Sequence, residues 1–274
     1  MAVTNGPQIA ISQIHAEVGG TGQASLNDAD IRGLIGKGAG AQMAMSEWYG
    51  ARAPIAYLGS TSTVQGGSNN TGVFSISLTS LGLQQGDMVI VACAQEGPGS
   101  GSTKGYTTSG WTQQTPNTYQ TSYSPGGASY YKIMGATPDT SFGWTLGGYY
   151  FGIPMVAVAF RNVGTRKTAS WQGVNYGNSV NIPTRNVADA GSVSILTTTR
   201  GGNNAEDSPT SRLSTPSGYT KAVTRYSSNA GLGYNWEQAV DIFYKLNCPA
   251  GSLNPGTHTW YFYGDANVNH SIFY

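Results

Sequence analysis

The spacing of apolar residues changes once along the chain, close to Pro54. Before this point, three short segments place apolar residues one helical turn apart and then end in glycine: 9–20, 24–36 and 44–50. Each carries a small polar residue that we take as a helix N-cap, at Ser12, Asn27 and Ser46. None is long enough to bury an apolar face by itself. We therefore predict a separate, short helical or irregular segment over residues 1–52.

After Pro54 the period becomes two, and residues 53–274 are predicted to form one β domain. In 73–78, Phe74, Ile76 and Leu78 share one face, whereas 88–94 is a continuous apolar run that is typical of a central strand. Further strand-like runs lie at 128–133, 141–146, 155–160, 192–199, 240–246 and 258–263. The pattern predicts an all-β fold, a two-sheet β-sandwich of jelly-roll type.

The β domain has an internal repeat, in which residues 86–163 resemble residues 191–274 element by element. Both stretches read as an apolar strand, a long loop, Ser-Gly-aromatic-Thr, a strand with an aromatic-Tyr-Lys sequence and further aromatic strands. The Ser-Gly-aromatic-Thr pair begins at Ser109 and Ser217. We expect two related halves that close on a shared core.

Composition narrows the function classes. Charged residues make up 10% of the chain and the formal net charge is +1, so no strong field attracts the protein to nucleic acid or to an anionic membrane. The chain has 39 glycines, but its 6 Trp, 17 Tyr and 7 Phe argue against disorder. Its two cysteines, Cys93 and Cys248, are expected to be free buried thiols.

No sequence motif indicates catalysis, a metal site or a cofactor. The histidines at positions 15, 258 and 270 have no partner at metal-ligand spacing, and GxSxG, HExxH and complete P-loop patterns are missing from the sequence. We expect no enzyme, no metal and no cofactor. A polysaccharide depolymerase stays an alternative, because a pair of carboxylates can be assembled by the fold without a sequence motif.

Aromatic residues in the two long predicted loops, 95–127 and 200–236, are the candidate binding residues. Such loops on a rigid sandwich commonly carry recognition, and aromatic faces stack on sugars. The candidates are Tyr106, Tyr119, Tyr123, Tyr226, Tyr234 and Trp236. The alternative is that these rings pack their own loops.

The order of short motifs resembles virion proteins of tailed phages. Ile11-Ser12-Gln13-Ile14, then Glu17-Val18-Gly19-Gly20, Ser25-Leu26 and Met45 to Gly50 are similar to the N-terminal module of tail-fibre and appendage proteins. Val18 stands where that module usually has Phe. The 86–94 run, Ser-Gly-Trp-Thr, Tyr-Tyr-Lys-Ile and the 156–163 strand resemble a phage tail β-sandwich.

The resemblance implies a structural virion component, most simply a tail fibre or baseplate appendage made in the host cytoplasm. It implies partners among virion proteins, a homo-oligomer such as a trimer, and a host surface glycan, without nucleic acid or membrane insertion. The expected virion-anchor residues are Ile11, Ile14, Ile31, Leu34, Trp48 and Tyr49. These would dock on a partner or on other copies, or else fold back on the sandwich. A head decoration or head-fibre protein is the structural alternative.

Overall fold

The computed structural model describes residues 10–20, 23, 25–48, 51–65, 72–95, 106–107, 109–114, 126–146, 152–203, 214–228 and 236–274. The chain divides into two compact units, Met1–Ile55 and Ala56–Tyr274. We call them the N-terminal unit and the β domain. Sequence patterning placed this boundary between residues 52 and 53.

The N-terminal unit contains α1 (Ile11–Glu17), α2 (Ala29–Gly33) and the 3-10 turn η1 (Met45–Trp48). Each segment opens with two residues, three positions apart, that are joined by two hydrogen bonds. The backbone N–H of the later residue donates to the carbonyl of the earlier one. The side chain of the later residue accepts the backbone N–H of the earlier one. All these hydrogen bonds measure 2.8–3.0 Å. The pairs are Ala10–Gln13, Ser25–Asp28 and Ala44–Glu47. The predicted caps at Ser12, Asn27 and Ser46 were therefore wrong, since each lies immediately before the residue whose side chain caps.

The three segments form a core of their own. Ile14, Ile31 and Trp48 are fully buried, and Val18, Leu26, Leu34, Ile35 and Met43 pack against them. No segment buries its apolar face by itself, because each buries it on the other two. Of the expected anchor residues, Ile14, Ile31 and Trp48 are thus enclosed, Leu34 is half-buried and Ile11 is exposed. Tyr49 lies outside the described residues.

The β domain contains antiparallel sheets whose strands are bounded as follows. Sheet A contains, in spatial order, β1 (Ala56–Gln65), β8 (Ile153–Arg161), β3 (Met88–Gln95), β6 (Gly126–Ile133) and β5 (Thr112–Gln113). Sheet B contains β2 (Gly72–Ser77), β7 (Ser141–Leu146) and β4 (Tyr106–Thr107), and the turn η2 (Thr79–Leu81) follows β2. Sheet C contains β12 (Thr220–Ser228), β13 (Trp236–Cys248), β11 (Ser192–Asn203), β15 (Thr257–Phe273) and β9 (Arg166–Asn181). A separate pair joins β10 (Arg185–Val187) to β14 (Gly251–Leu253).

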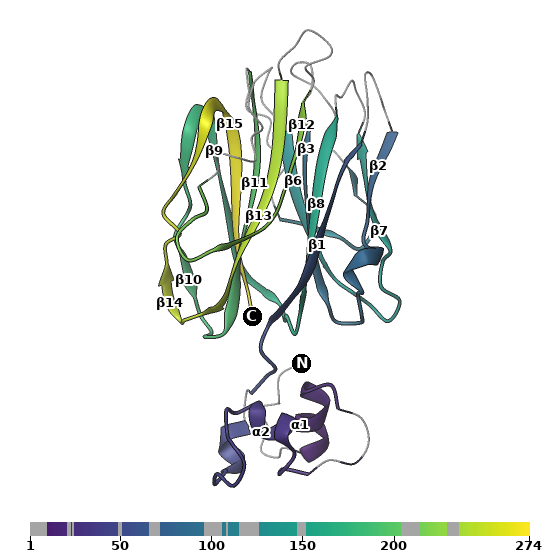
Figure 1. Cartoon of the computed structure of the whole chain (residues 1–274), viewed down its shortest axis with the longest axis vertical. Coiled ribbons are helices and arrows are strands. Elements are labelled where there is room, and N and C mark those ends of the chain that lie inside the picture. Colours follow the sequence, from purple (N-terminus) through teal and green to yellow (C-terminus); the bar gives the residue numbers. More distant parts are fainter. Residues whose placement is uncertain are drawn as a thin grey trace. The chain divides into compact units, whose positions relative to one another are not determined.

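These sheets stack in layers, with sheet A between sheets B and C (Figure 1). One face of sheet A, including Val89, Val91 and Tyr130, forms a core with Phe142 and Trp144 of sheet B. The far face of sheet C is covered by an outer layer, in which the end of β9 pairs with the start of β15. Val180 from this layer packs with Leu196, Phe243 and Val268 of sheet C. The all-β prediction is confirmed.

Burial follows the predicted alternation. In β2, Phe74 and Ile76 are buried, whereas Val73 is 69% exposed. The continuous apolar run 88–94 is β3, the central strand of sheet A, and it is buried on both faces. Cys93 and Cys248 are buried free thiols, as predicted.

The two halves have the same strand order. Sheet A reads β5-β6-β3-β8-β1 and sheet C reads β12-β13-β11-β15-β9, so each strand of one sheet has a counterpart at the same place in the other. The registers agree as well: Met88 pairs with Phe160 in sheet A, and Val193 pairs with Phe273 in sheet C. The repeat is longer than 86–163 and 191–274, because β1 and β2 correspond to the single long strand β9. β7 and β8 correspond likewise to β15.

Sheet A contacts sheet C through reciprocal contacts. Tyr131 of the first half packs edge-on against Phe273 of the second, with ring centroids 5.3 Å apart at 70°. Their counterparts, Tyr244 and Phe160, pack at 5.5 Å and 75° with the halves exchanged. Such exchange is the property of an isologous interface between two-fold-related copies, here within one chain.

We expect the N-terminal unit to depend on its own core. Trp48→Ala should destabilise it by about 3–5 kcal/mol, as large-to-small aromatic substitutions in cores do. Because so small a unit has little stability to lose, its NMR signals should collapse to unfolded positions while the melting of the β domain stays unchanged. Ile11→Ala, at an exposed site, should cost under about 0.5 kcal/mol. Joint melting of both units in Trp48→Ala would contradict separate cores.

The reciprocal ring pairs should be energetically alike. Double-mutant cycles to alanine on Tyr131/Phe273 and on Tyr244/Phe160 should each give a coupling energy of about 0.5–1.5 kcal/mol. Urea denaturation of the unmodified chain, the four single variants and the two double variants measures it. A coupling energy near zero in one pair and large in the other would show that the interface is not equivalent on its two sides.

Candidate functional site

The strand ends of the β domain divide its connections into two kinds. Gln65 pairs with Ile153, Gln95 with Gly126, and Asn203 with Trp236, and all these pairs lie at one end of the domain (Figure 1). We call this the loop end, because long connections outside the described residues leave from it. The opposite end, the turn end, holds short turns such as 162–165 between β8 and β9.

The chain enters and leaves the β domain at the turn end. β1 starts at Ala56, which pairs with Arg161. The carbonyl of the last residue, Tyr274, accepts a hydrogen bond from Gly164 N–H in the turn between the halves. The Arg161 guanidinium also forms a bidentate ion pair with buried Asp87, at 2.9 Å for both contacts, which raises the pKa of Arg161. Both termini of this domain are thus tied down at one end.

The predicted binding aromatics are associated with the loop end, as far as the structure describes them. Tyr226, near the end of β12, is 36% exposed. Tyr106 lies in β4 and Trp236 begins β13. Tyr119, Tyr123 and Tyr234 lie outside the described residues. Tyr106, Tyr226 and Trp236 are therefore strand residues at the borders of loops, where sequence reasoning expected loop positions.

A hydrogen-bonded Ser–His pair lies inside the second half. His270 Nε2 lies 2.8 Å from Ser194 Oγ, and Ser194 Oγ lies 2.6 Å from Tyr219 Oη. His270 Nδ1 donates to the Pro183 carbonyl at 2.6 Å, which leaves Nε2 as the acceptor for Ser194. Burial lowers the pKa of His270 to about 4 and raises that of Tyr219. Since Ser194 and His270 are fully buried, this pair cannot meet a substrate and instead ties β15 to the segment after β9.

A second buried network surrounds an ion pair on the face of sheet C that is turned toward the outer layer. Arg200 Nη2 lies 2.8 Å from Asp241 Oδ2, and both side chains are fully buried. Thr198 and Thr224 donate to the two Asp241 oxygens at 2.9 and 2.7 Å. His258 stacks edge-on on Phe243 at 5.2 Å, and burial lowers its pKa to about 4. The carboxylate is saturated with donors and therefore acts as a structural group.

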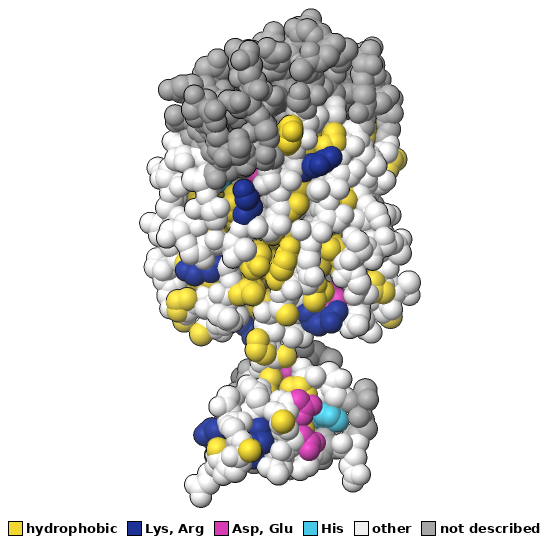
Figure 2. All heavy atoms as spheres, viewed as in Figure 1, with side chains coloured by type: hydrophobic (Ala, Val, Ile, Leu, Met, Phe, Trp, Pro, Cys, Tyr) yellow, Lys and Arg dark blue, Asp and Glu magenta, His cyan; other side chains and the backbone are white. Residues whose placement is uncertain are grey.

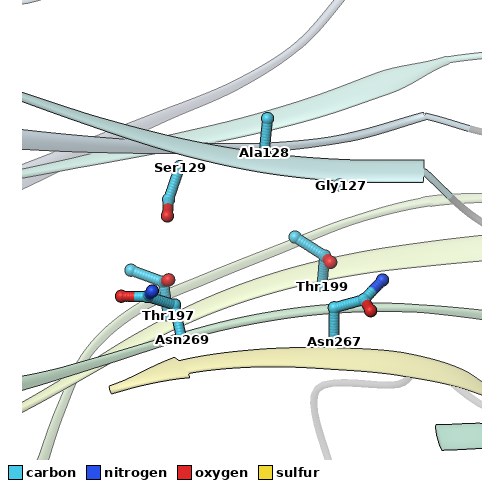
Figure 3. A pocket seen from close by; sticks show the side chains of 7 residues that line it. All are labelled: Gly127, Ala128, Ser129, Thr197, Thr199, Asn267 and Asn269. Carbon is cyan, nitrogen blue, oxygen red and sulfur yellow. The ribbon is translucent and has the colours of Figure 1, made fainter. Parts of the chain in front are cut away.

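A small polar cavity lies between sheet A and sheet C. It has a volume of about 10 Å³, on the order of one water molecule. Its lining residues are Gly127 and Ser129 of β6, Thr197 and Thr199 of β11, and Asn267 and Asn269 of β15, whereas the Ala128 side chain points away (Figure 3). A Cβ at Gly127 would overlap the Thr199 side chain, so only glycine permits this approach of the sheets.

The visible surface is mainly uncharged. Figure 2 shows few charged side chains on the β domain, whereas in the N-terminal unit Asp or Glu side chains lie beside a histidine. Within the described ranges, no group of three or more His, Cys, Asp and Glu side chains is arranged to hold a metal ion. In the same part of the chain, no helix is both long enough and apolar enough to cross a membrane.

Comparison of the chain with protein-family models, curated proteins and solved structures finds no match.

Sequence reasoning missed both buried networks. A signal was present for the ion pair: Arg200 follows the strand-like run 192–199 and Asp241 interrupts the run 240–246, and a lone charge inside a buried strand needs a partner. For His270 and Ser194 no local signal exists, because they are 76 residues apart.

The buried histidines make the β domain sensitive to acid. Their folded pKa of about 4 lies below the usual value of 6.5, so the native state holds them neutral. The free energy of unfolding is therefore at its full value above pH 6.5. It decreases by roughly 3 kcal/mol per histidine as the pH falls toward 4. We expect urea midpoints to drop steadily across this window.

The matched variant is His258→Phe, because Phe142 occupies the corresponding position in the first half. It should reduce the loss of unfolding free energy between pH 6.5 and 4.5 by about half, relative to the chain with both histidines. His15→Asn, in the N-terminal unit, is the control. An unchanged pH slope in His258→Phe would show that His258 is not the acid-sensitive group.

Proposed function

We propose that the protein is a structural component of a tailed-phage virion, a tail fibre or baseplate appendage. In this proposal the N-terminal unit attaches the chain and the loop end of the β domain meets the host surface. The observation that carries it is the polarity of the β domain. Both Ala56 and Tyr274 lie at the turn end, whereas the strand ends Gln65, Gln95 and Asn203 lie at the opposite end. The motif order within residues 9–51 supplies the virion context.

The N-terminal unit would act as a folded plug. Since Ile14, Ile31 and Trp48 are enclosed, attachment has to use its surface, and the exposed large apolar side chain in its described part is Ile11, 38% exposed on α1. Tightly capped turns suit a rigid plug, because little conformational entropy is lost when such a surface docks. Partners are other virion proteins and further copies of the chain.

Contacts at the loop end would be weak singly and strong together. A mainly uncharged surface with aromatic residues such as Tyr226 suits stacking on a host glycan, and several copies on one particle multiply a low affinity. A head decoration protein would use the same attachment without a receptor. Immunogold labelling of virions with an antibody against the β domain separates the two: label on the tail supports the appendage, and label on the head contradicts it.

Attachment is tested with Ile11→Asp in the full chain. The substitution places an acidic residue in the first turn of α1, where it favours the helix, so the unit should stay folded. It should reduce incorporation into particles at least tenfold, measured by quantitative immunoblotting of purified virions.

The matched control is Ile133→Asp in the β domain, since Ile133 is 39% exposed. It changes the same residue type at the same exposure and should leave incorporation unchanged. Equal incorporation of Ile11→Asp and the unmodified chain would reject α1 as the docking surface.

A further inference from the structure

We propose that the polar cavity between the two halves is a binding site for one structural water molecule. The cavity joins β6 of the first half to β11 and β15 of the second. Its volume of about 10 Å³ is on the order of one water molecule. The proposal does not rest on the virion assignment.

The lining groups provide the hydrogen-bond partners that a water needs. Among the described residues, three buried atoms of the lining have no protein partner: Thr199 Oγ1, Asn267 Oδ1 and Asn269 Nδ2. The side chains of Thr199 and Asn269 are both more than nine-tenths buried. A buried polar group that is left unpaired destabilises the fold, because it loses the hydrogen bonds that it makes to water in the unfolded chain. One water accepting from Asn269 and bonded to the other two oxygens satisfies all three atoms.

A relay of side chains directs the Asn269 amide into the cavity. Gln114 Nε2 donates to Ser271 Oγ at 3.2 Å, and Ser271 Oγ donates to Asn269 Oδ1 at 2.7 Å. Because its oxygen is engaged by Ser271, Asn269 presents its N–H donors to the cavity. The relay runs from sheet A to sheet C, so the water continues a polar contact between the halves.

The internal repeat supplies a comparison site within the same chain. Thr197 pairs with Asn269 at the position where the first half pairs Ala92 with Val156. Ala92, Ala94 and Val156 are buried and apolar. The interface is therefore polar at Thr197–Asn269 and apolar at the corresponding pair Ala92–Val156. The reciprocal aromatic contacts beside these two places have the same geometry. Gly127 keeps the polar place open, since any side chain there would meet Thr199.

The water should be observed directly in the full chain. A high-resolution crystal structure should show density within hydrogen-bond distance of Thr199 Oγ1 and Asn269 Nδ2. In solution, the Asn269 side-chain amide should give a cross-peak to a long-lived water, and Thr199→Val, which keeps the shape and removes the hydroxyl, should abolish that cross-peak and lower the melting midpoint. Thr145→Val, at an exposed threonine of β7, is the control and should change neither.

Ser271→Ala provides a second variant in case Thr199→Val does not fold. It leaves the cavity lining intact and frees the Asn269 amide, so the cross-peak should weaken through faster exchange of the water. A cavity without density and without a cross-peak in the unmodified chain would overturn the proposal. So would a melting midpoint that depends on Na⁺ or K⁺ and loses this dependence in Thr199→Val, because the occupant would then be a cation.

Discussion

The packing of sheet A on sheet C is the contact on which the rest of the β domain depends. Tyr131 meets Phe273 and Tyr244 meets Phe160 in the same geometry with the halves exchanged. A face that is complementary to its own copy buries apolar area on both sheets at once, and that burial is the main favourable term in folding. This contact also places corresponding strand ends of the two halves at the same end of the domain, so Gln95 and Asn203 both lie at the loop end.

The two halves keep one topology and differ in chemistry. The second half holds the Arg200–Asp241 ion pair and two buried histidines, whereas the places that correspond to Asp241 and His258 in the first half are the apolar residues Ala128 and Phe142. Buried charges contribute little net stability when paired but cost several kcal/mol when one partner is lost. The fold of the second half therefore depends on buried polar networks in which every member keeps its partner. The fold of the first half depends on apolar packing.

The two ends of the β domain differ. β1 begins at Ala56 beside Arg161, and Gly164 N–H binds the Tyr274 carbonyl at the same end of the domain. A large-to-small substitution in a buried strand, as at Val89 or Val268, would create a cavity. Surface connections tolerate substitutions better, because they do not fill the core.

The sequence by itself determined the fold class, because period-two alternation such as Phe74, Ile76 and Leu78 specifies a half-buried strand wherever that strand pairs. It also indicated the repeat and the change of unit near Pro54. Tertiary structure alone decided that the three N-terminal segments bury one another, because mutual burial of Ile14, Ile31 and Trp48 depends on how separate turns meet in space. It alone decided that β9 belongs to the repeat, since its pairing matches β1 and β2 without a shared motif. The candidate site divides in the same way: Tyr226 was predictable as an aromatic near a loop, but the pairing of Ser194 with His270 and the cavity at Thr199 bring together residues that only strand register makes neighbours.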